Sequence, residues 1–431
     1  MKSETTAGRS GERPVFSPEP CIVIATSISR PSRIMRIGVD ATSWANARGY
    51  GRFTREIVAA MVALAPADEF VCFLDPLSDA CFHLDSPNVR KVVVATVREA
   101  PVRAASASSS RTMIDMLRMT AAVRRERLDV FFSPTVYAYF PLPPRLRAVV
   151  TIHDTIPERF PDLTLPSRKM RLFWRLKVGL AIRQARRILT VSDHAARDLE
   201  RVHGIPRSRI TVATEAPSST FYPMTDKESG DVAAALTPVL GDLPSRRRWF
   251  TYVGGFNPHK NVPMLIRAHA ALARELGDAA PILVLVGAHD YDDFFSDVPA
   301  ITAAIDREGT AAIVKWTGFL EDEILRYIHS LAIALVLPSD AEGFGLPAVE
   351  AAACGSPVIA TRESPLPDLL PGAGFFIAPR DEAALLSAMR ELATNTELHR
   401  RFSRAALEAT GSLTWERGAW AALATIREAA A

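Results

Sequence analysis

The sequence has few cysteines, no long hydrophobic run and little net charge. Its 431 residues include four cysteines, Cys21, Cys72, Cys81 and Cys354. They form no CxxC pair and match no metal-ligand spacing, which argues against a disulfide scaffold and a zinc ribbon. No apolar run approaches the roughly 18 residues that a transmembrane helix needs. The 51 Lys and Arg residues exceed the 48 Asp and Glu residues by only three, so bulk charge does not indicate nucleic acid as a partner. A reducing, cytoplasmic setting is the simplest interpretation.

The composition is that of an ordinary globular protein. Hydrophobic residues make up 48% and charged residues 23%, which excludes a disordered chain. At about 150 residues per domain, the length predicts two to three domains. Residues 1–34 are rich in Ser, Pro and Arg, and we expect a disordered N-terminal extension there. A second interpretation is that the start is misassigned and the protein begins at Met35.

From Met35 onward, short apolar runs alternate with longer amphipathic segments, a pattern typical of parallel α/β folds. Pro and Gly residues interrupt this pattern between residues 215 and 247, after which it restarts. We therefore expect two Rossmann-like domains facing one another across a cleft, at residues 35–235 and 245–410, followed by a C-terminal helix at 411–431. The strands are predicted at 35–40, 70–74, 91–97, 130–133, 148–153, 188–192 and 210–213, and then at 250–253, 282–286, 313–316, 334–337, 358–360 and 375–377. Ligands bind such sheets at the carboxyl ends of the strands.

The strongest chemical signal lies in residues 339–351. A buried strand leads into a loop with Gly343 and Gly345, and a proline begins the helix that follows. Backbone N–H groups and the positive end of a helix suit phosphate or sugar oxygens. Glu342 in the loop and Glu350 in the helix can accept hydrogen bonds from the paired hydroxyls of a ribose or a hexose. The alternative is that Glu342 caps the helix and Glu350 is a solvated helix residue.

The Glu342-x7-Glu350 spacing, with Gly-Phe-Gly inside it, resembles the signature of retaining glycosyltransferases of family 4, the group 1 type, which have the GT-B fold of two Rossmann-like domains. Other segments resemble landmarks of the same family: the diphosphate-binding turn at residues 252–262, the N-terminal-domain segments at 150–157 and 189–193, and the early glycine loop at 48–53. The resemblance covers roughly residues 35–425. It implies an enzyme that transfers a hexose from a nucleotide-diphosphate sugar to a hydroxyl acceptor.

The resemblance also implies roles for particular residues. His153, Lys260 and Glu342 are the expected catalytic residues, and Lys260 would neutralise the leaving nucleoside diphosphate. The family has an arginine five residues before this lysine, where this chain has Gly255, and His259 is a candidate for a partial substitute. A solvated Lys260 at a helix start is the alternative. The expected donor-binding residues are Gly49, Gly51, Gly255, His259, Lys260, Glu342, Gly343, Phe344, Gly345, Leu346 and Glu350.

The implied chemistry is a front-face displacement in which the departing phosphate takes the acceptor proton. We expect no obligatory metal and no other cofactor. Asp290-Tyr-Asp292-Asp293 matches the short metal motif of the other large glycosyltransferase fold, but a solvated loop is the simpler interpretation. Ser192-Asp193-His194 cannot form a nucleophilic triad because adjacent residues cannot reach that geometry, and we expect the serine or the aspartate to cap the next helix instead.

The segment Ser167–Arg187 carries eight Lys and Arg residues and no acidic residue, with aromatic and aliphatic residues between them. It predicts either a packed helix with a solvated face or a peripheral contact with an anionic membrane, where a lipid-linked glycan acceptor would lie. The expected partners are a nucleotide sugar and a glycan or lipid-linked acceptor, with GDP-mannose favoured as the donor. Two rivals stay open: a nucleotide-sugar epimerase of the same fold, and a non-catalytic binding protein, which the missing arginine at Gly255 favours.

Overall fold

The computed structural model describes residues 34–96, 112–225, 228–241, 248–288 and 296–431. The predicted extension therefore lies outside the described residues except for Ile34, which is exposed. The Asp290–Asp293 motif lies outside them as well.

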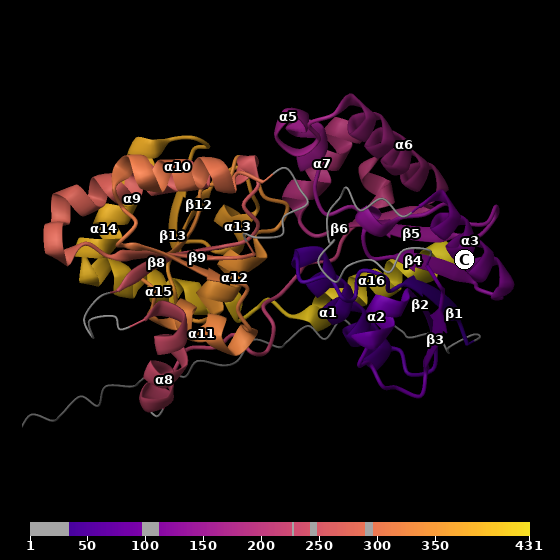
Figure 1. Cartoon of the computed structure of the whole chain (residues 1–431). Helices are drawn as coiled ribbons and strands as arrows, with labels where there is room; N and C mark the ends of the chain where they lie inside the picture. The colour runs from indigo at the N-terminus through magenta and orange to yellow at the C-terminus, as the bar shows by residue number, and fades with distance from the viewer. Residues whose placement is uncertain (1–33, 97–111, 226–227, 242–247, 289–295) are drawn as a thin grey trace, which may run out of the picture. The chain divides into compact units, whose positions relative to one another are not determined.

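The described chain forms two parallel β-sheets, each flanked by helices (Figure 1). The first sheet has seven strands in the order β3-β2-β1-β4-β5-β6-β7, and the second has six in the order β10-β9-β8-β11-β12-β13. Both sheets have the Rossmann order, with the chain reversing its direction of growth between β1 and β4 and again between β8 and β11. The predicted α/β fold with two Rossmann-like halves, the GT-B architecture, is confirmed.

The strands of the first sheet are β1 (Arg36–Asp40), β2 (Glu69–Leu74), β3 (Val89–Val93), β4 (Val130–Ser133), β5 (Ala148–Thr151), β6 (Arg187–Thr190) and β7 (Ile210–Val212). Those of the second are β8 (Trp249–Val253), β9 (Ile282–Val286), β10 (Val314–Gly318), β11 (Ala334–Leu337), β12 (Val358–Thr361) and β13 (Gly374–Ile377). Each of them overlaps a predicted strand. The largest error is at the first sheet's edge, where the strand predicted at 91–97 lies at Val89–Val93.

The helices before the chain crosses to the second sheet are α1 (Gly49–Leu64), α2 (Pro76–Ala80), α3 (Met113–Arg125), α4 (Ile156–Arg159), α5 (Pro161–Thr164), α6 (Arg168–Gln184) and α7 (Asp193–His203). The later ones are α8 (Ser229–Leu240), α9 (Val262–Leu276), α10 (Val298–Glu308), α11 (Asp322–Leu331), α12 (Leu346–Ala353), α13 (Leu366–Leu369), α14 (Glu382–Thr394), α15 (Thr396–Thr410) and α16 (Trp415–Ala430). Short 3-10 turns lie at η1 (Val136–Ala138), η2 (Arg207–Arg209), η4 (Pro258–Lys260) and η5 (Gly277–Ala279).

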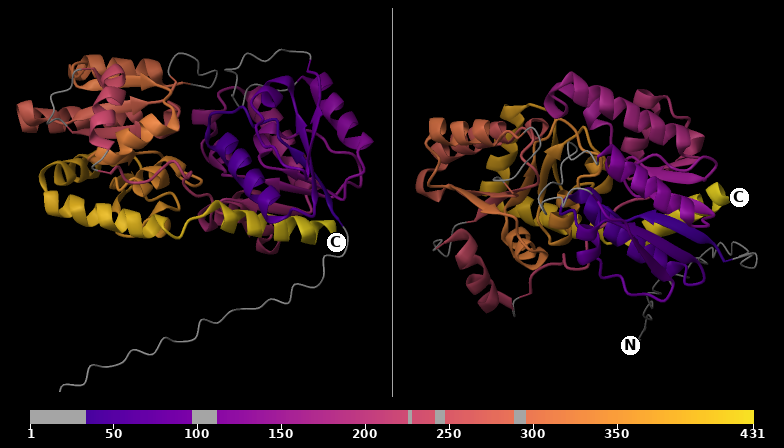
Figure 2. Two further views of the ribbon diagram at one scale, coloured as in Figure 1. Left: turned by 90° about the horizontal axis from the view of Figure 1, so that it is seen from below. Right: turned by 45° about the vertical axis from the view of Figure 1, so that its right-hand side comes forward.

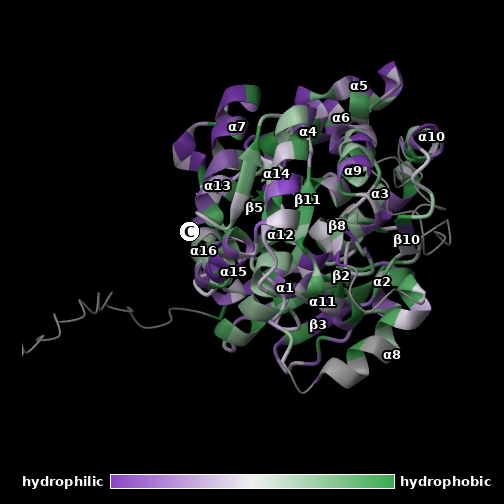
Figure 3. Cartoon of the chain, turned by 90° about the vertical axis from the view of Figure 1, so that its left-hand side faces the viewer, coloured by the Kyte–Doolittle hydropathy of each residue, from purple (hydrophilic) through white to green (hydrophobic). Residues whose placement is uncertain are grey.

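The central strands are buried because helices cover both faces of each sheet. Every residue of β4, β5, β9, β11 and β12 is buried. Figure 3 shows the hydrophobic colouring of β5. Local signals set the helix ends. Ser192 caps α7 by accepting a hydrogen bond from the Ala195 N–H at 3.0 Å, as predicted, and Gly204 ends that helix in the left-handed conformation.

The structure corrects the predicted domain boundary at residues 235–245. Helix α8 begins at Ser229, inside the stretch predicted as part of the first domain, and packs against α11 and β10 of the second half. Val232, Leu236 and Leu240 join a hydrophobic cluster with Trp249 and its neighbours in the second half. The chain therefore crosses between β7 and α8. The stretch whose proline and glycine residues suggested a linker contains this helix, and Pro238 lies inside it.

The predicted C-terminal helix is present as α16, and its position could not be read from the sequence. It packs against α1 and β4 to β7 of the first half rather than against the second sheet (Figures 1 and 2). Trp415 makes an edge contact with Phe53, with ring centroids 6.1 Å apart. Gly418 lies so close to the chain that a Cβ atom there would stand 2.3 Å from the Thr214 carbonyl oxygen. The last helix therefore returns to complete the first half.

Candidate active site

The loops that follow β8 and β11 meet at the switch point of the second sheet. The β8 loop ends in η4 and at Asn261, which adopts the left-handed conformation at φ 54° just before α9. The Asn261 side chain donates hydrogen bonds to the Pro338 carbonyl at 3.1 Å and to Asp340 Oδ1 at 2.9 Å. The Asp340 N–H in turn donates to the His259 carbonyl at 2.7 Å. These bonds join the two predicted functional loops into one site.

Lys260 and Glu342 form the central ion pair of this site. Lys260 Nζ donates to Glu342 Oε1 at 2.7 Å and to Oε2 at 2.9 Å. Ser339 Oγ donates to the same Oε1 at 2.6 Å. Glu342 is buried, so the predicted alternative in which it caps the helix does not apply: Gly345 is the N-cap residue, at φ 86°. Lys260 is not a solvated residue either, since its side chain is only 18% exposed.

His259 is uncharged in the ligand-free protein. Its ring is buried, and burial lowers the pKa of His259 well below its usual value, an effect that the neighbouring charges of Lys260 and Arg48 reinforce. The imidazole is therefore neutral near pH 7. Without a ligand, His259 therefore adds no positive charge beside Lys260, and its role as a partial substitute for the missing arginine stays a prediction.

Two of the expected donor-binding residues have their side chains in the hydrophobic core. Phe344 and Leu346 are buried and pack in the main cluster with strands β8 and β11. Gly345 lies against Leu366, where an added Cβ atom would stand 2.8 Å from a methyl group. At these three positions only the backbone can face a ligand, through the free N–H groups at the start of α12.

His153 follows β5 in the first half and is fixed by three neighbours. Its Nε2 lies 3.0 Å from the Pro134 carbonyl oxygen, and its Nδ1 lies 3.6 Å from Glu215 Oε1. The ring makes an edge contact with Phe53, with centroids 4.8 Å apart. Because a carbonyl only accepts, Nε2 carries a proton, and His153 is held in one orientation.

The Glu342 loop touches His153 directly through Gly343. A Cβ atom on Gly343 would stand 2.7 Å from the His153 carbonyl oxygen and 2.9 Å from the Asp154 Cβ. On the same loop, the Gly343 carbonyl accepts a hydrogen bond of 2.8 Å from Ser192 Oγ, the residue that also caps α7. The loop that carries Glu342, which is paired with Lys260, therefore lies against the backbone of His153, so the three expected catalytic residues come from segments that are in contact.

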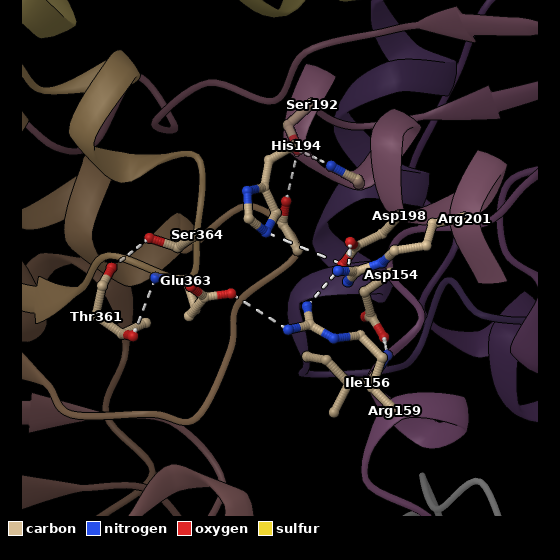
Figure 4. Close-up of polar contacts among 12 residues, drawn as sticks. Asp154, Ile156, Arg159, Ser192, His194, Asp198, Arg201, Thr361, Glu363 and Ser364 are labelled. Atoms are coloured by element: carbon tan, nitrogen blue, oxygen red, sulfur yellow. Dashed lines mark hydrogen bonds and ion pairs between the residues drawn. The ribbon is translucent and has the colours of Figure 1, made fainter. Parts of the chain in front are cut away.

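A second bridge between the halves involves Arg159 (Figure 4). Its guanidinium contacts Asp198 at 2.7 Å in the first half and Glu363 at 3.3 Å in the second. Beside it lies a cavity of about 400 Å³, lined by Arg159, Phe160, Asp340, Glu363, Pro379 and Arg380. Arg380 binds Asp340 through two hydrogen bonds of 2.9 Å. Through Asp340 the cavity borders the loop that carries Glu342. Its lining has the carboxylates, guanidinium groups and aromatic ring that sugar hydroxyls and sugar rings contact.

Glu350 is buried rather than solvated, since the residue is 3% exposed. Its Oε1 lies 3.1 Å from Arg52 Nη1 of the first half. Burial raises the pKa of Glu350 to about 8, and the Arg52 charge opposes part of that increase. In the same way, burial raises the pKa of Asp154, against the opposing effects of the Ile156 N–H, His153 and Lys260.

The glycines of the early loop differ in what they contact. A Cβ atom on Gly51 would stand 2.1 Å from the Asn46 carbonyl oxygen, so the tight turn itself requires glycine. Gly49 has no neighbour within 4 Å of that position and is exposed. In the loop after β8, the carbonyl of Gly255 accepts a hydrogen bond of 2.5 Å from the Tyr252 hydroxyl. The tight turn alone therefore accounts for the glycine at position 51.

Four polar residues of the site were absent from the predicted set: Arg52, Asp154, Ser192 and Glu215. Arg52 and Asp154 directly follow the predicted residues Gly51 and His153 in the chain, and that adjacency was the available signal. Within the described ranges, no group of three or more His, Cys, Asp or Glu residues has the geometry to hold a metal ion. None of the helices described is long and apolar enough to cross a membrane.

Comparisons with known proteins agree with this fold. The model of "Glycosyl transferases group 1" matches residues 241–409, and the model of "Glycosyltransferase Family 4" matches residues 48–214. The chain belongs to the group 1 glycosyltransferases with the GT-B fold.

Among its relatives is the O-antigen chain mannosyltransferase B of Escherichia coli, 28% identical over 345 residues that cover 78% of this chain and 84% of the relative. A GDP-mannose-dependent phosphatidylinositol dimannoside mannosyltransferase of Mycobacterium tuberculosis is 32% identical over 128 residues, 29% of this chain and 33% of the relative. Sucrose-phosphate synthase of Thermosynechococcus elongatus shares the fold, with a TM-score of 0.71 and 19% identity over 92% of this chain and 99% of that one. This chain is therefore a glycosyltransferase whose relatives include mannosyltransferases of polysaccharide assembly.

Proposed function

We propose that the protein is a retaining, metal-independent hexosyltransferase of the cytoplasm that transfers mannose from GDP-mannose, or a closely similar sugar from a similar donor, to a hydroxyl of a growing surface polysaccharide. The observation that carries the proposal is the Lys260–Glu342 pair at the β8/β11 switch point, in a loop whose Gly343 lies against the His153 carbonyl of the other half. The names of the mannosyltransferase relatives support the choice of sugar.

In this proposal Lys260 exchanges partners when the donor binds. Its ammonium now binds Glu342, and the donor diphosphate would take that place as a stronger anion. Negative charge grows on the diphosphate as the glycosidic bond breaks, so a lysine there stabilises the transition state more than the ground state. Glu342 would then be free to accept hydrogen bonds from hydroxyls of the transferred sugar, and the departing phosphate would take the acceptor proton.

His153 has a different part in the proposal. Its ring is oriented by Pro134 and Glu215, and its backbone carbonyl adjoins Gly343. It would therefore lie close to the transferred sugar. The acceptor would enter through the cavity lined by Arg159 and Asp340, whose polar groups suit sugar hydroxyls.

The test is a panel of GDP-, UDP- and dTDP-sugars, with release of the nucleoside diphosphate as the signal and the anomeric configuration of the product read by NMR. Transfer from GDP-mannose with an α-linked product is the expected result. Release from UDP- or dTDP-sugars would replace the donor, an inverted product would refute retention, and no release from any donor would favour the non-catalytic binding protein.

Two substitutions test the division of labour within the site. Lys260→Ala should lower kcat by about 10² to 10³-fold, because a cation at the leaving group acts mainly in the transition state. Glu350→Gln should raise the donor KM more than it lowers kcat, because the donor ribose that it is proposed to bind does not change during the reaction. A change in KM alone for Lys260→Ala, together with loss of kcat for Glu350→Gln, would reverse these roles.

We further propose that helix α6 contacts an anionic membrane surface. One side of the helix is buried through Trp174, Val178 and Ala181. The other side exposes the apolar residues Leu172 and Leu176 among several arginines and lysines, without an acidic residue in the helix. A basic face with exposed leucines is suited to anionic headgroups, and the proposed acceptor would then be lipid-linked.

A further inference from the structure

Arg52 connects the two halves of the protein at Glu350, the second carboxylate of the Glu342-x7-Glu350 pair. Its guanidinium binds Asp322 through two hydrogen bonds, Nη1 to Oδ2 at 2.8 Å and Nη2 to Oδ1 at 2.6 Å. Nη1 also lies 3.1 Å from Glu350 Oε1. Arg52 belongs to α1 of the first half, whereas Asp322 begins α11 and Glu350 lies in α12 of the second.

Local structure fixes where Arg52 points. The tight turn at Gly51 places Arg52 in the first turn of α1, with its N–H bonded to the Arg48 carbonyl at 3.0 Å. Its side chain is 16% exposed, and its guanidinium lies over the Phe221 ring at 5.5 Å. A two-bond contact with a carboxylate fixes the plane of a guanidinium as well as its position. Asp322 therefore orients Arg52 toward Glu350.

Glu350 needs a cation because its surroundings are acidic. The charged groups that act on it are Arg52, Asp322, Glu215 and Glu56, and of these only Arg52 is positive. Glu350 Oε1 is buried and has no hydrogen-bond partner within the described part of the chain, although Arg52 lies beside it. A carboxyl group in such a place loses its charge unless a cation compensates, and a protonated carboxyl accepts fewer hydrogen bonds.

We propose that Arg52 is a positioning residue for the donor site: from the first half of the protein it holds the Glu350 carboxylate where it accepts hydrogen bonds from the hydroxyls of the donor nucleotide. This inference rests on the proposed function, which places a nucleotide sugar at Glu350. It adds that the carboxylate of one half recognises the donor only while the guanidinium of the other half compensates its charge.

The position of the acidic groups explains why the role belongs to Arg52 and not to Asp322. Asp322 contacts the guanidinium but raises the pKa of Glu350, as Glu215 and Glu56 do, after the larger effect of burial. Replacing Arg52 with methionine would leave Glu350 among Asp322, Glu215 and Glu56 without the one cation that acts on it. Arg55 would remain, but it acts on Glu56 and Asp322. Glu350 would then stay protonated to a higher pH than in the wild-type protein, where burial raises its pKa to about 8.

The test measures the dissociation constant of GDP by calorimetry between pH 6 and 9.5, with UDP in parallel, for the wild type, Arg52→Met, Arg52→Lys, Asp322→Asn and Glu350→Gln. Wild-type binding should tighten as the pH rises through about 8, while Glu350→Gln should show no such step. Arg52→Met should bind GDP about tenfold more weakly at pH 7.5, and its rise in affinity should occur about one pH unit or more above that of the wild type. Arg52→Lys should recover part of the loss. Asp322→Asn should move the rise in affinity to a lower pH than in the wild type, because the removed carboxylate is one of the groups that raise the Glu350 pKa. Equal or tighter binding by Arg52→Met, or an unshifted step, would overturn the proposal.

A ligand-free measurement separates this inference from the proposed function. Because Glu350 has a raised pKa in the folded protein, its contribution to stability is present at low pH and is lost as the pH rises from about 4.5 toward 8. The urea midpoint of the wild type, measured relative to that of Glu350→Gln, should therefore fall as the pH rises over this range. In Arg52→Met the midpoint should go on falling at higher pH. If no nucleotide binds but this difference appears, the proposed function fails and the Arg52–Glu350 contact stands. If the curves with and without Arg52 coincide, the Arg52 proposal itself fails.

Discussion

Gly343→Ala is the substitution whose effect the structure defines most closely. The added methyl group would lie 2.7 Å from the His153 carbonyl oxygen and 2.9 Å from the Asp154 Cβ. Carbon contacts are favourable at about 3.5–4.0 Å, so the groups must separate by about half an ångström or more. Both neighbours include backbone or a Cβ atom, so no side chain can rotate away to make room.

The required movement separates the Glu342 loop from the strand end that carries His153. It also strains the 2.8 Å hydrogen bond from Ser192 Oγ to the Gly343 carbonyl, because that carbonyl belongs to the displaced residue. Overpacking of this kind costs about 1–3 kcal/mol of stability. A misplacement approaching 1 Å between reacting groups costs about 10²-fold in rate. We therefore expect kcat/KM to fall by about 10 to 10²-fold, with a lower urea midpoint.

The assay is nucleoside diphosphate release at saturating acceptor, followed by urea unfolding of the same preparation. Gly179→Ala is the matched control: it adds the same methyl group inside α6, where nothing lies within 4 Å. It should leave kcat/KM unchanged and stabilise the protein by about 0.5–1 kcal/mol, since alanine is the better helix former. Wild-type kinetics for Gly343→Ala would refute the direct contact of this loop with His153 in the working enzyme.

Three further predictions concern stability, metal and membrane. The His329 ring is buried without a hydrogen-bond partner in the described structure, and burial lowers its pKa to about 3. Below about pH 6.5 the unfolded chain binds a proton at this histidine that the folded protein does not bind, so lowering the pH to 5 costs about 2 kcal/mol of stability. His329→Leu should remove this pH dependence in urea titrations, whereas His83→Leu, at an exposed position, should keep it. Chelation by EDTA should leave turnover intact, and a loss that Mn²⁺ or Mg²⁺ restores would contradict metal independence and revive the Asp290–Asp293 motif. The protein should sediment with anionic vesicles and be released at 1 M salt, where the screening length is about 3 Å; Leu176→Ser should weaken this binding and Leu407→Ser, on α15, should not, while equal binding to neutral vesicles would count against a membrane role for α6.

Signals between neighbours in the chain explain most of what the sequence predicted correctly. Runs such as Ile282–Val286 are apolar at every position, which identifies strands buried on both faces. The serine at 192 and the glycines at 204 and 345 mark helix ends, because a cap needs a particular side chain or a positive φ at that residue alone. The same local reasoning failed at α8, where prolines and glycines imitated a linker although the apolar residues between them pack on the second half.

The sequence predicted which residues form the candidate site better than it predicted the contacts that they make. The spacing of Glu342 and Glu350 pointed to the loop and helix of the proposed donor site, and the Gly-rich turn pointed to Lys260. The sequence could not show that Lys260 binds Glu342 in the absence of a ligand. It also could not show that Phe344 belongs to the core, because a phenylalanine between two glycines can face either direction until the surrounding elements are packed.

The sequence by itself therefore determined the elements, their order and the residues that bear chemistry, since each depends on neighbours within a few positions. Only the tertiary structure decided which groups from distant elements meet: Arg52 with Glu350, Gly343 with His153, and α16 with the first half. The physical reason is that such contacts depend on how helices and sheets pack. Packing depends on the complementary surfaces of whole elements, which are assembled only when the chain folds.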